Sequence, residues 1–226
     1  MDVTDLIFLW IAELVPLFAT MFSFIYGLRH FFKKGKPLCL QSFTMAMASH
    51  SLGSVYHLCQ SLTSKTVVDG FTPAYLGRIG FFLFIITASY GQLDKIVDDG
   101  SSKMRPARRI ALIAPACALL LYLPNVMYAP TLVSTKIVYA CVWIPAIISV
   151  YFNLKHALIP DLDFGFIKAL KPYNIFTLLL GFAELACLTA WNYYYPLQMA
   201  IMSSIFAILC VCTMLAAKKG VDKWSI

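Results

Sequence analysis

Apolar segments and short polar connections alternate along the whole chain. A helix rises about 1.5 Å per residue, so roughly 20 apolar residues cross the hydrocarbon core of a bilayer. Seven segments approach or exceed that requirement, and the connections between them are short. We therefore predict an all-α polytopic membrane protein, a single bundle of seven transmembrane helices over residues 1–226. The predicted spans are 6–28, 38–62, 74–93, 110–123, 132–154, 173–193 and 197–217.

Residues that interrupt helices set the predicted boundaries. We expect Pro124 and Asn125 to end the short fourth span, and a tight turn at 194–196 to separate the last two spans. The connection at 155–172 interleaves apolar residues with lysines, so an amphipathic segment on the membrane surface and a plain loop fit it equally. The first span follows two aspartates instead of the basic region of a signal peptide, and we expect it to be retained.

The second span carries a polar stripe. Its sequence is LCLQSFTMAMASHSLGSVYHLCQSLT, which is uncharged but contains two histidines. At helical spacing one face presents His50, Ser54, His57 and Ser61. Polar groups are costly in hydrocarbon unless they find partners, so this face should meet other helices or a water-filled cavity.

Composition and charge fix the class and the orientation. The chain has 226 residues, of which 60% are hydrophobic and 13% charged, whereas about a quarter of the residues are charged in soluble domains. Of 18 lysines and arginines, fifteen lie in the first, third and fifth connections and the C-terminal tail, two lie in the other connections, and Arg78 lies within a span. By the positive-inside rule the N-terminus is outside and the C-terminus is cytosolic, in a multi-pass protein of the cell membrane.

Ionisable side chains inside the predicted spans converge on one leaflet. Counted from the outer end of each span, Glu13, His57, Arg78 and Glu184 fall in the outer half, and His50 lies near the middle of the bilayer. We therefore predict an outward-facing ligand-binding cavity lined by Glu13, His50, Ser54, His57, Arg78 and Glu184.

Each of these residues also has a structural interpretation. Arg78 is close enough to the interface to extend its side chain outward to water. The two glutamates could hold helices together as protonated carboxyls, and the histidines could bond serines on neighbouring helices.

Several function classes are excluded or weakened by missing residues. A net charge of +7 does not indicate nucleic acid, because the basic residues alternate with the spans and form no single patch. The seventh span has no lysine for a retinal chromophore, and the third lacks the acidic-Arg-aromatic triplet of hormone-type receptors. The seven cysteines show no CxxC spacing, so we expect no metal and no cofactor.

Three functions remain open. We favour a small-molecule transporter, with proton coupling through the glutamates and histidines, over a seven-helix sensor that signals through a protein partner at the basic cytosolic loops. A membrane-embedded enzyme, with zinc held by Glu13, His57 and Glu184, is the third, although the residues favour a protein that is not an enzyme. Polar residues look sparse in the inner half, which weakens the transporter hypothesis.

Overall fold

The structure, a computed structural model, describes residues 2–32, 38–63, 72–94, 98, 100–128, 133–159 and 166–224. All secondary structure in these residues is helical, which confirms the all-α prediction. The elements are α1 (Val3–Phe31), α2 (Leu38–Thr63), α3 (Pro73–Ala88), η1 (Ser89–Asp94), η2 (Ser102–Met104), α5 (Arg105–Ala111), α6 (Ile113–Tyr128), α7 (Val133–Leu158), α8 (Phe166–Tyr193) and α9 (Pro196–Trp224).

Length and hydropathy mark this as a membrane protein. Within the described residues, five helical segments are long and apolar enough to cross a bilayer: α1, the segment from η2 to α6, α7, α8 and α9. The apolar helix α3 is shorter, and α2 is not among the five. Many large apolar side chains of these helices are exposed on the outside of the bundle, as lipid contact requires.

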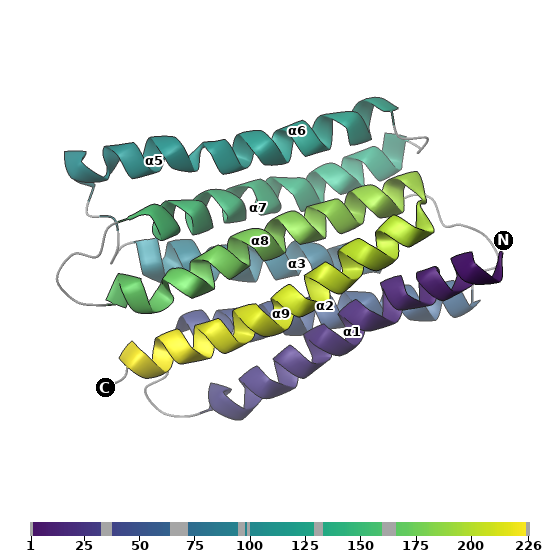
Figure 1. Ribbon diagram of the computed structural model, residues 1–226, viewed down its shortest axis with the longest axis horizontal. Coiled ribbons are helices and arrows are strands. Elements are labelled where there is room, and N and C mark those ends of the chain that lie inside the picture. The colour runs from purple at the N-terminus through teal and green to yellow at the C-terminus, as the bar shows by residue number, and fades with distance from the viewer. Residues whose placement is uncertain are drawn as a thin grey trace.

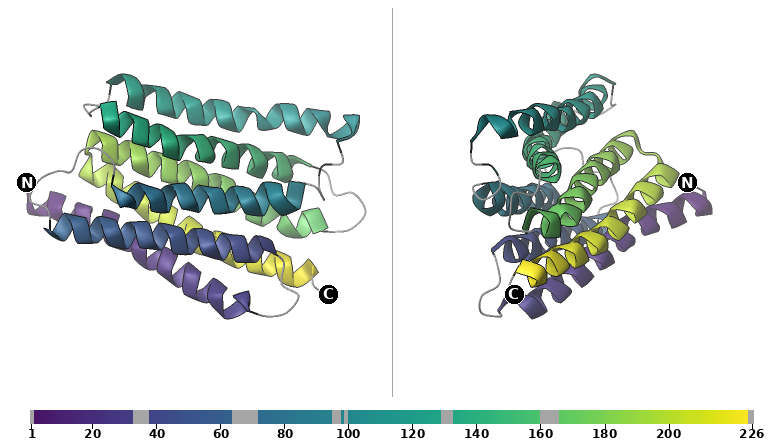
Figure 2. Two further views of the ribbon diagram at one scale, coloured as in Figure 1. Left: turned by 180° about the vertical axis from the view of Figure 1, so that it is seen from behind. Right: turned by 60° about the vertical axis from the view of Figure 1, so that its left-hand side comes forward.

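Six helices form a closed ring, and one segment lies outside it. Following the contacts around the bundle, the order is α1, α2, α3, α7, α8 and α9, and α9 then packs against α1 again. The segment α5–α6 packs on the outside of α7 and α8 (Figures 1 and 2). The two termini lie at opposite ends of the bundle, which we call the N-end and the C-end (Figure 1).

The distribution of charge differs between the two ends. Helices α1, α3, α7 and α9 run from the N-end to the C-end, and α2, α6 and α8 run back (Figure 1). Among the described lysines and arginines, only Arg78 and Lys136 lie toward the N-end. The charge bias predicted from the sequence is therefore a bias between the two ends of one bundle.

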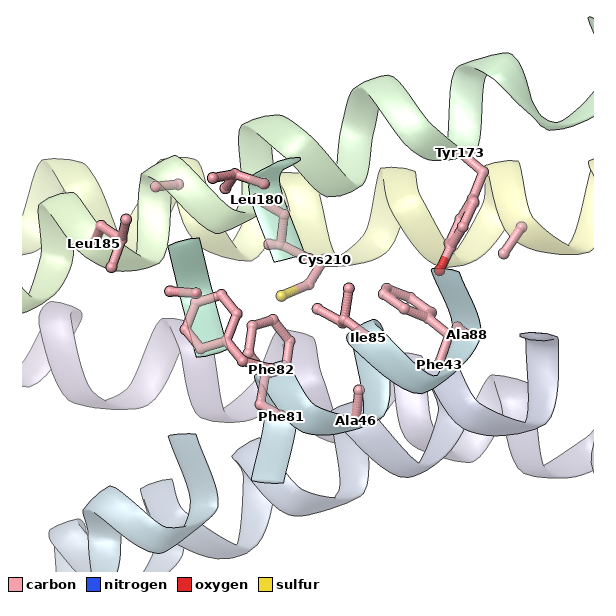
Figure 3. Packing of buried hydrophobic residues seen from close by; sticks show 14 of the residues in the cluster. Phe43, Ala46, Phe81, Phe82, Ile85, Ala88, Tyr173, Leu180, Leu185 and Cys210 are labelled. Atoms are coloured by element: carbon pink, nitrogen blue, oxygen red, sulfur yellow. The ribbon is translucent and has the colours of Figure 1, made fainter. Parts of the chain in front are cut away.

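A tightly packed apolar layer fills the middle of the ring. Phe81, Phe82 and Ile85 of α3 are fully buried there. They meet Leu180 of α8 and Cys210 of α9 in a cluster that extends toward the C-end (Figure 3). Protein interiors packed this closely hold few voids larger than a water molecule.

Two glycines allow α2 and α3 to approach closely. A Cβ atom added at Gly77 would lie 2.6 Å from the Cα atom of Gly53 and 2.7 Å from the carbonyl oxygen of Ser49. The hydroxyl of Ser49 donates a hydrogen bond to the Gly77 carbonyl at 3.0 Å, which ties the same two helices together. Small residues at such crossings are the usual device for packing helices within membranes.

We expect Gly77→Ala to lower the free energy of unfolding by about 1–3 kcal/mol, because the backbones must separate to admit the methyl group. Gly181→Ala is the matched control, since its Cβ would meet no neighbouring backbone, only the side chains of Val150 at 2.9 Å and Phe82 at 3.9 Å. There a gain in helix propensity of up to about 1 kcal/mol offsets the crowding. Unfolding of both variants in mixed micelles measures the difference, and equal losses would contradict the close crossing.

The fourth predicted span was too short. Pro124 lies within α6, which continues to Tyr128. The side chain of Asn125 donates to the Leu121 carbonyl at 2.8 Å and to Thr189 Oγ1 at 3.1 Å, and it accepts from Asn192 at 2.9 Å. These bonds hold α6 on α8, and tertiary packing overrides the helix-breaking tendency of the proline.

The connection at 155–172 is mostly helical and is not a separate surface segment. Residues 155–158 complete α7, and α8 already begins at Phe166, so Pro172 lies inside a helix. The intervening 160–165 lie outside the described residues. The tight turn before α9 is confirmed, with Tyr194 in the left-handed region at φ 55° and Pro196 as the first helical residue.

The third span changes its helix type near the C-end. The α-helix ends at Ala88, and Ser89–Asp94 form a π-helical turn. Ser89 Oγ donates to Asn153 Oδ1 of α7 at 3.3 Å. The chain thus contacts α7 at the place where the helix widens. π-helical turns are frequent at functional sites.

Candidate functional site

A pocket opens between α1, α2, α3, α8 and α9 in the N-end half of the bundle. We call it the N-end pocket. All six side chains predicted from the sequence line it: Glu13, His50, Ser54, His57, Arg78 and Glu184. They come from four helices, and Ser203 and Phe206 of α9 complete the wall. The convergence of these side chains is a property of the fold, whereas their role toward a ligand stays a prediction.

A buried ion pair forms the floor of the N-end pocket. Arg78 Nε lies 2.9 Å from Oε1 of Glu184, and the Glu184 side chain is only 2% exposed. Arg78 therefore does not extend outward to water, and its 18% exposure leaves it bordering the pocket. Breaking such a pair would leave a buried charge without compensation, so the two side chains hold α3 to α8.

His50 links the ion pair to the polar stripe of α2. Its Nε2 lies 3.4 Å from Oε2 of Glu184, and its Nδ1 lies 3.2 Å from Oγ of Ser54, one turn along the same helix. The imidazole stacks on Phe206 at 4.7 Å and meets Phe81 edge-on at 5.3 Å between ring centroids. The structural interpretation expected a serine on a neighbouring helix. The serine partner of His50 instead lies on α2 itself.

A second polar group lies nearer the opening of the pocket. Ser61 Oγ donates to Oε1 of Glu13 at 2.8 Å, and His57 Nε2 lies 3.9 Å from the same oxygen. The His57 ring meets Trp191 of α8 edge-on at 5.0 Å. Thus α1, α2 and α8 are joined here by side chains from the predicted stripe, including Ser61, which the predicted site did not contain.

The hypothetical zinc site is not assembled. Glu13 approaches His57, while Glu184 is held by Arg78 and His50. Among the residues that the structure describes, no three histidine, cysteine, aspartate or glutamate side chains form a group able to hold a metal ion. The two glutamates are held by different partners in separate groups, so they do not converge with His57 on one point.

The size of the pocket restricts what fits in this state. Its volume is about 30 Å³, and a buried water needs roughly 10–15 Å³ by this measure. One or two waters or a very small ligand would fill it. Any larger ligand requires the helices around the pocket to separate.

A second charged cluster lies at the C-end and was missed in the sequence. Lys155 of α7 is buried, and its ammonium contacts Asp94 of η1 and lies 3.2 Å from Oδ2 of Asp98. His156 Nε2 lies 3.0 Å from Oδ1 of Asp94. Arg108 of α5 donates two hydrogen bonds to the Asp98 carboxylate, from Nε to Oδ2 at 2.8 Å and from Nη2 to Oδ1 at 2.6 Å. We call these five residues the C-end cluster.

The C-end cluster ties three elements together outside the ring's apolar layer. It joins η1, α7 and α5 through charge-assisted hydrogen bonds, which are the stronger kind. Arg108 foremost, with Lys155, holds the pKa of Asp98 far below its ordinary value, so this carboxylate is ionised at neutral pH.

A recognisable signal in the sequence leads to this cluster. Ser149, Asn153 and His156 recur at i, i+4 and i+7, the spacing that identified the stripe of the second span. Asn153 Nδ2 donates to the Ser149 carbonyl at 2.8 Å, and the buried polar face continues to Lys155 and His156. Ending the predicted fifth span at residue 154 separated these residues and hid the pattern.

The two polar sites lie on shared helices with the apolar layer between them. Helix α3 carries Arg78, then Phe81, Phe82 and Ile85, and its η1 extension carries Asp94. Sixteen residues separate the two charged side chains, roughly 24 Å along a helix.

Comparison of the chain with protein-family models, curated proteins and solved structures finds no match.

Proposed function

We propose that the protein is a small-molecule carrier of the cell membrane, with seven spans and the N-end facing outside. Five long apolar helical segments support the membrane location, and α2 and the shorter apolar helix α3 complete the ring as the other two spans. The concentration of lysine and arginine at the C-end supports the orientation, because basic residues accumulate on the cytosolic side.

One observation carries the proposal: buried charged clusters lie in both halves of the bundle, and a packed apolar layer separates them. Buried charges in a bilayer are costly, and an ionisable side chain there indicates a functional site, such as a solute or ion pathway, by default. A sensor needs the N-end pocket but has no need of a second buried charge cluster near the opposite face. A carrier needs polar groups in both halves.

The geometry suggests how access would alternate. In the state described here, ion pairs of the C-end cluster hold η1 against α7 and α5 and close the cytosolic side. Rearrangement of those pairs would open the C-end, while closure of α1, α2 and α8 around Glu13 and His57 would seal the N-end. Such rocking of one helix group against another is the usual mechanism of small carriers.

The ring order also fits a parallel repeat. Helices α1–α2–α3 and α7–α8–α9 are sequential neighbours, with α5–α6 outside as the connecting segment. Pro16 and Pro145 lie near the middle of the first helix of each half. The polar residues of the two halves do not match, so the carrier proposal does not rest on the repeat.

Two-sided thiol labelling tests the proposal. In a background without the native cysteines, Ser54→Cys should react with an impermeant thiol reagent from outside, and Ser149→Cys should react from the cytosolic side. Thr213→Cys in α9, as fully buried as Ser149, is the matched control for that position and should stay protected. Reactivity at position 54 with complete protection at 149 would favour a sensor, and protection at both positions would contradict an outward-facing cavity.

A further inference from the structure

The two charged clusters have the same balance of acidic and basic groups. The N-end pocket combines Arg78 and two histidines with two glutamates. The C-end cluster combines Arg108, Lys155 and His156 with two aspartates. Each cluster thus has three basic and two acidic side chains, and each includes at least one histidine.

The C-end cluster distinguishes an anionic from a cationic solute. Two permanent cations face two carboxylates there, so the cluster is neutral while His156 is neutral. An arriving anion can be balanced by one proton on His156. An arriving cation would require one aspartate to become neutral. Both aspartates contact Arg108 or Lys155, and these cations favour the ionised form of a carboxyl group. A buried cluster therefore accepts a monovalent anion at lower cost than a cation.

The N-end pocket leads to the same conclusion. Arg78 and Glu184 both line the pocket, but the Arg78 side chain is 18% exposed and that of Glu184 only 2%, so an anion entering the pocket meets the guanidinium more readily than the carboxylate. With one proton among Glu13 and the two histidines this group of side chains is neutral, and an anion calls for one further proton. The small volume of about 30 Å³ favours an ion of few atoms.

From these charges we infer that the solute is a small monovalent anion, a short carboxylate or an inorganic oxyanion, carried together with one proton. The inference rests on the proposed function and names its substrate class. The described groups that face the N-end histidines are Glu13 of α1, Arg78 of α3, and Glu184 and Cys187 of α8, with Tyr75 and Tyr139 beside Arg78. Those around His156 are Asp94, Asp98, Lys155 and Arg108.

Thermal unfolding of the purified protein tests anion binding. Sodium gluconate is replaced by sodium formate or sodium nitrate at constant ionic strength, and methylammonium gluconate serves as the cationic probe. A specific ligand stabilises the folded state, so formate or nitrate should raise the unfolding midpoint by several degrees. Formate alone would indicate a carboxylate site, and nitrate as well would indicate a general oxyanion site. Arg78→Gln/Glu184→Gln, which keeps the pocket neutral, should abolish the shift.

A flux measurement keeps the inference testable if that double variant fails to fold. Nitrate is the anion of a strong acid, so it does not cross lipid as a neutral molecule. In proteoliposomes of the unmodified protein, an inward nitrate gradient should acidify the lumen, as read by a trapped pH dye, and protein-free liposomes should stay unchanged. Stabilisation by methylammonium alone, equal shifts in the double variant, or no acidification with nitrate would each overturn the inference. Two-sided thiol labelling would still decide the carrier proposal.

Discussion

Arg78→Gln is expected to lower the free energy of unfolding by about 3–5 kcal/mol, because it leaves the Glu184 carboxylate buried with His50 as its remaining partner among the described side chains. The Glu184 side chain is 2% exposed, so little water can solvate its carboxylate in place of the guanidinium. Unfolding of the purified variant in mixed micelles measures the loss.

Two further variants separate this effect from a general cost of removing an arginine. Arg105→Gln changes an exposed arginine of α5 and should shift stability by no more than about 0.5 kcal/mol. Arg78→Gln/Glu184→Gln removes both charges and should recover most of the lost stability while the solute site stays inactive. If the double variant is as unstable as the single one, the ion pair is not the source of the loss.

Lys155→Met should have an effect of similar size at the opposite end. The substitution roughly keeps the length of the side chain but leaves Asp94 with His156, and Asp98 with Arg108 and the Gly100 N–H, as partners. Loss of one partner from a buried charge group costs about 3–5 kcal/mol. Because the lost contacts hold η1 against α7, the variant should also label faster at a cysteine at position 149 from the cytosolic side.

The matched control for this prediction is Lys219→Met, an exposed lysine on α9. It changes the net charge of the C-end equally but breaks no buried pair, so stability and labelling at position 149 should stay near those of the parent protein. Equal behaviour of the two lysine variants would show that the C-end cluster does not close this side of the bundle.

The sequence predicts the pocket side chains well because membrane helices obey simple rules. Helical spacing places His50, Ser54 and His57 on one face, and depth along each span brings Glu13, Arg78 and Glu184 to the same half of the bilayer. It cannot give the pairings. Glu184 pairs with Arg78 and His50, whereas Glu13 accepts a hydrogen bond from Ser61. These pairings depend on the rotation of each helix and on the order of the helices around the ring.

The C-end cluster shows where span boundaries mislead. Lysine beside histidine after an apolar segment is typical of a cytosolic connection, so Lys155 and His156 fall in the predicted connection at 155–172 and outside the fifth span. The helix instead continues through them, and the carboxylates of Asp94 and Asp98 compensate their charge inside the fold. The partners lie about sixty residues away in the chain, and no local pattern reveals such a pairing.

Coupling between the two ends tests the account most directly. The measurement is the rate at which a cysteine at position 54 reacts with an impermeant thiol reagent from outside, compared between Lys155→Met and Lys219→Met. If the pocket and the C-end cluster open in alternation, loosening the C-end shifts the population toward the inward-open state, and labelling at position 54 slows several-fold in Lys155→Met. An equal or faster rate in Lys155→Met would contradict alternating access.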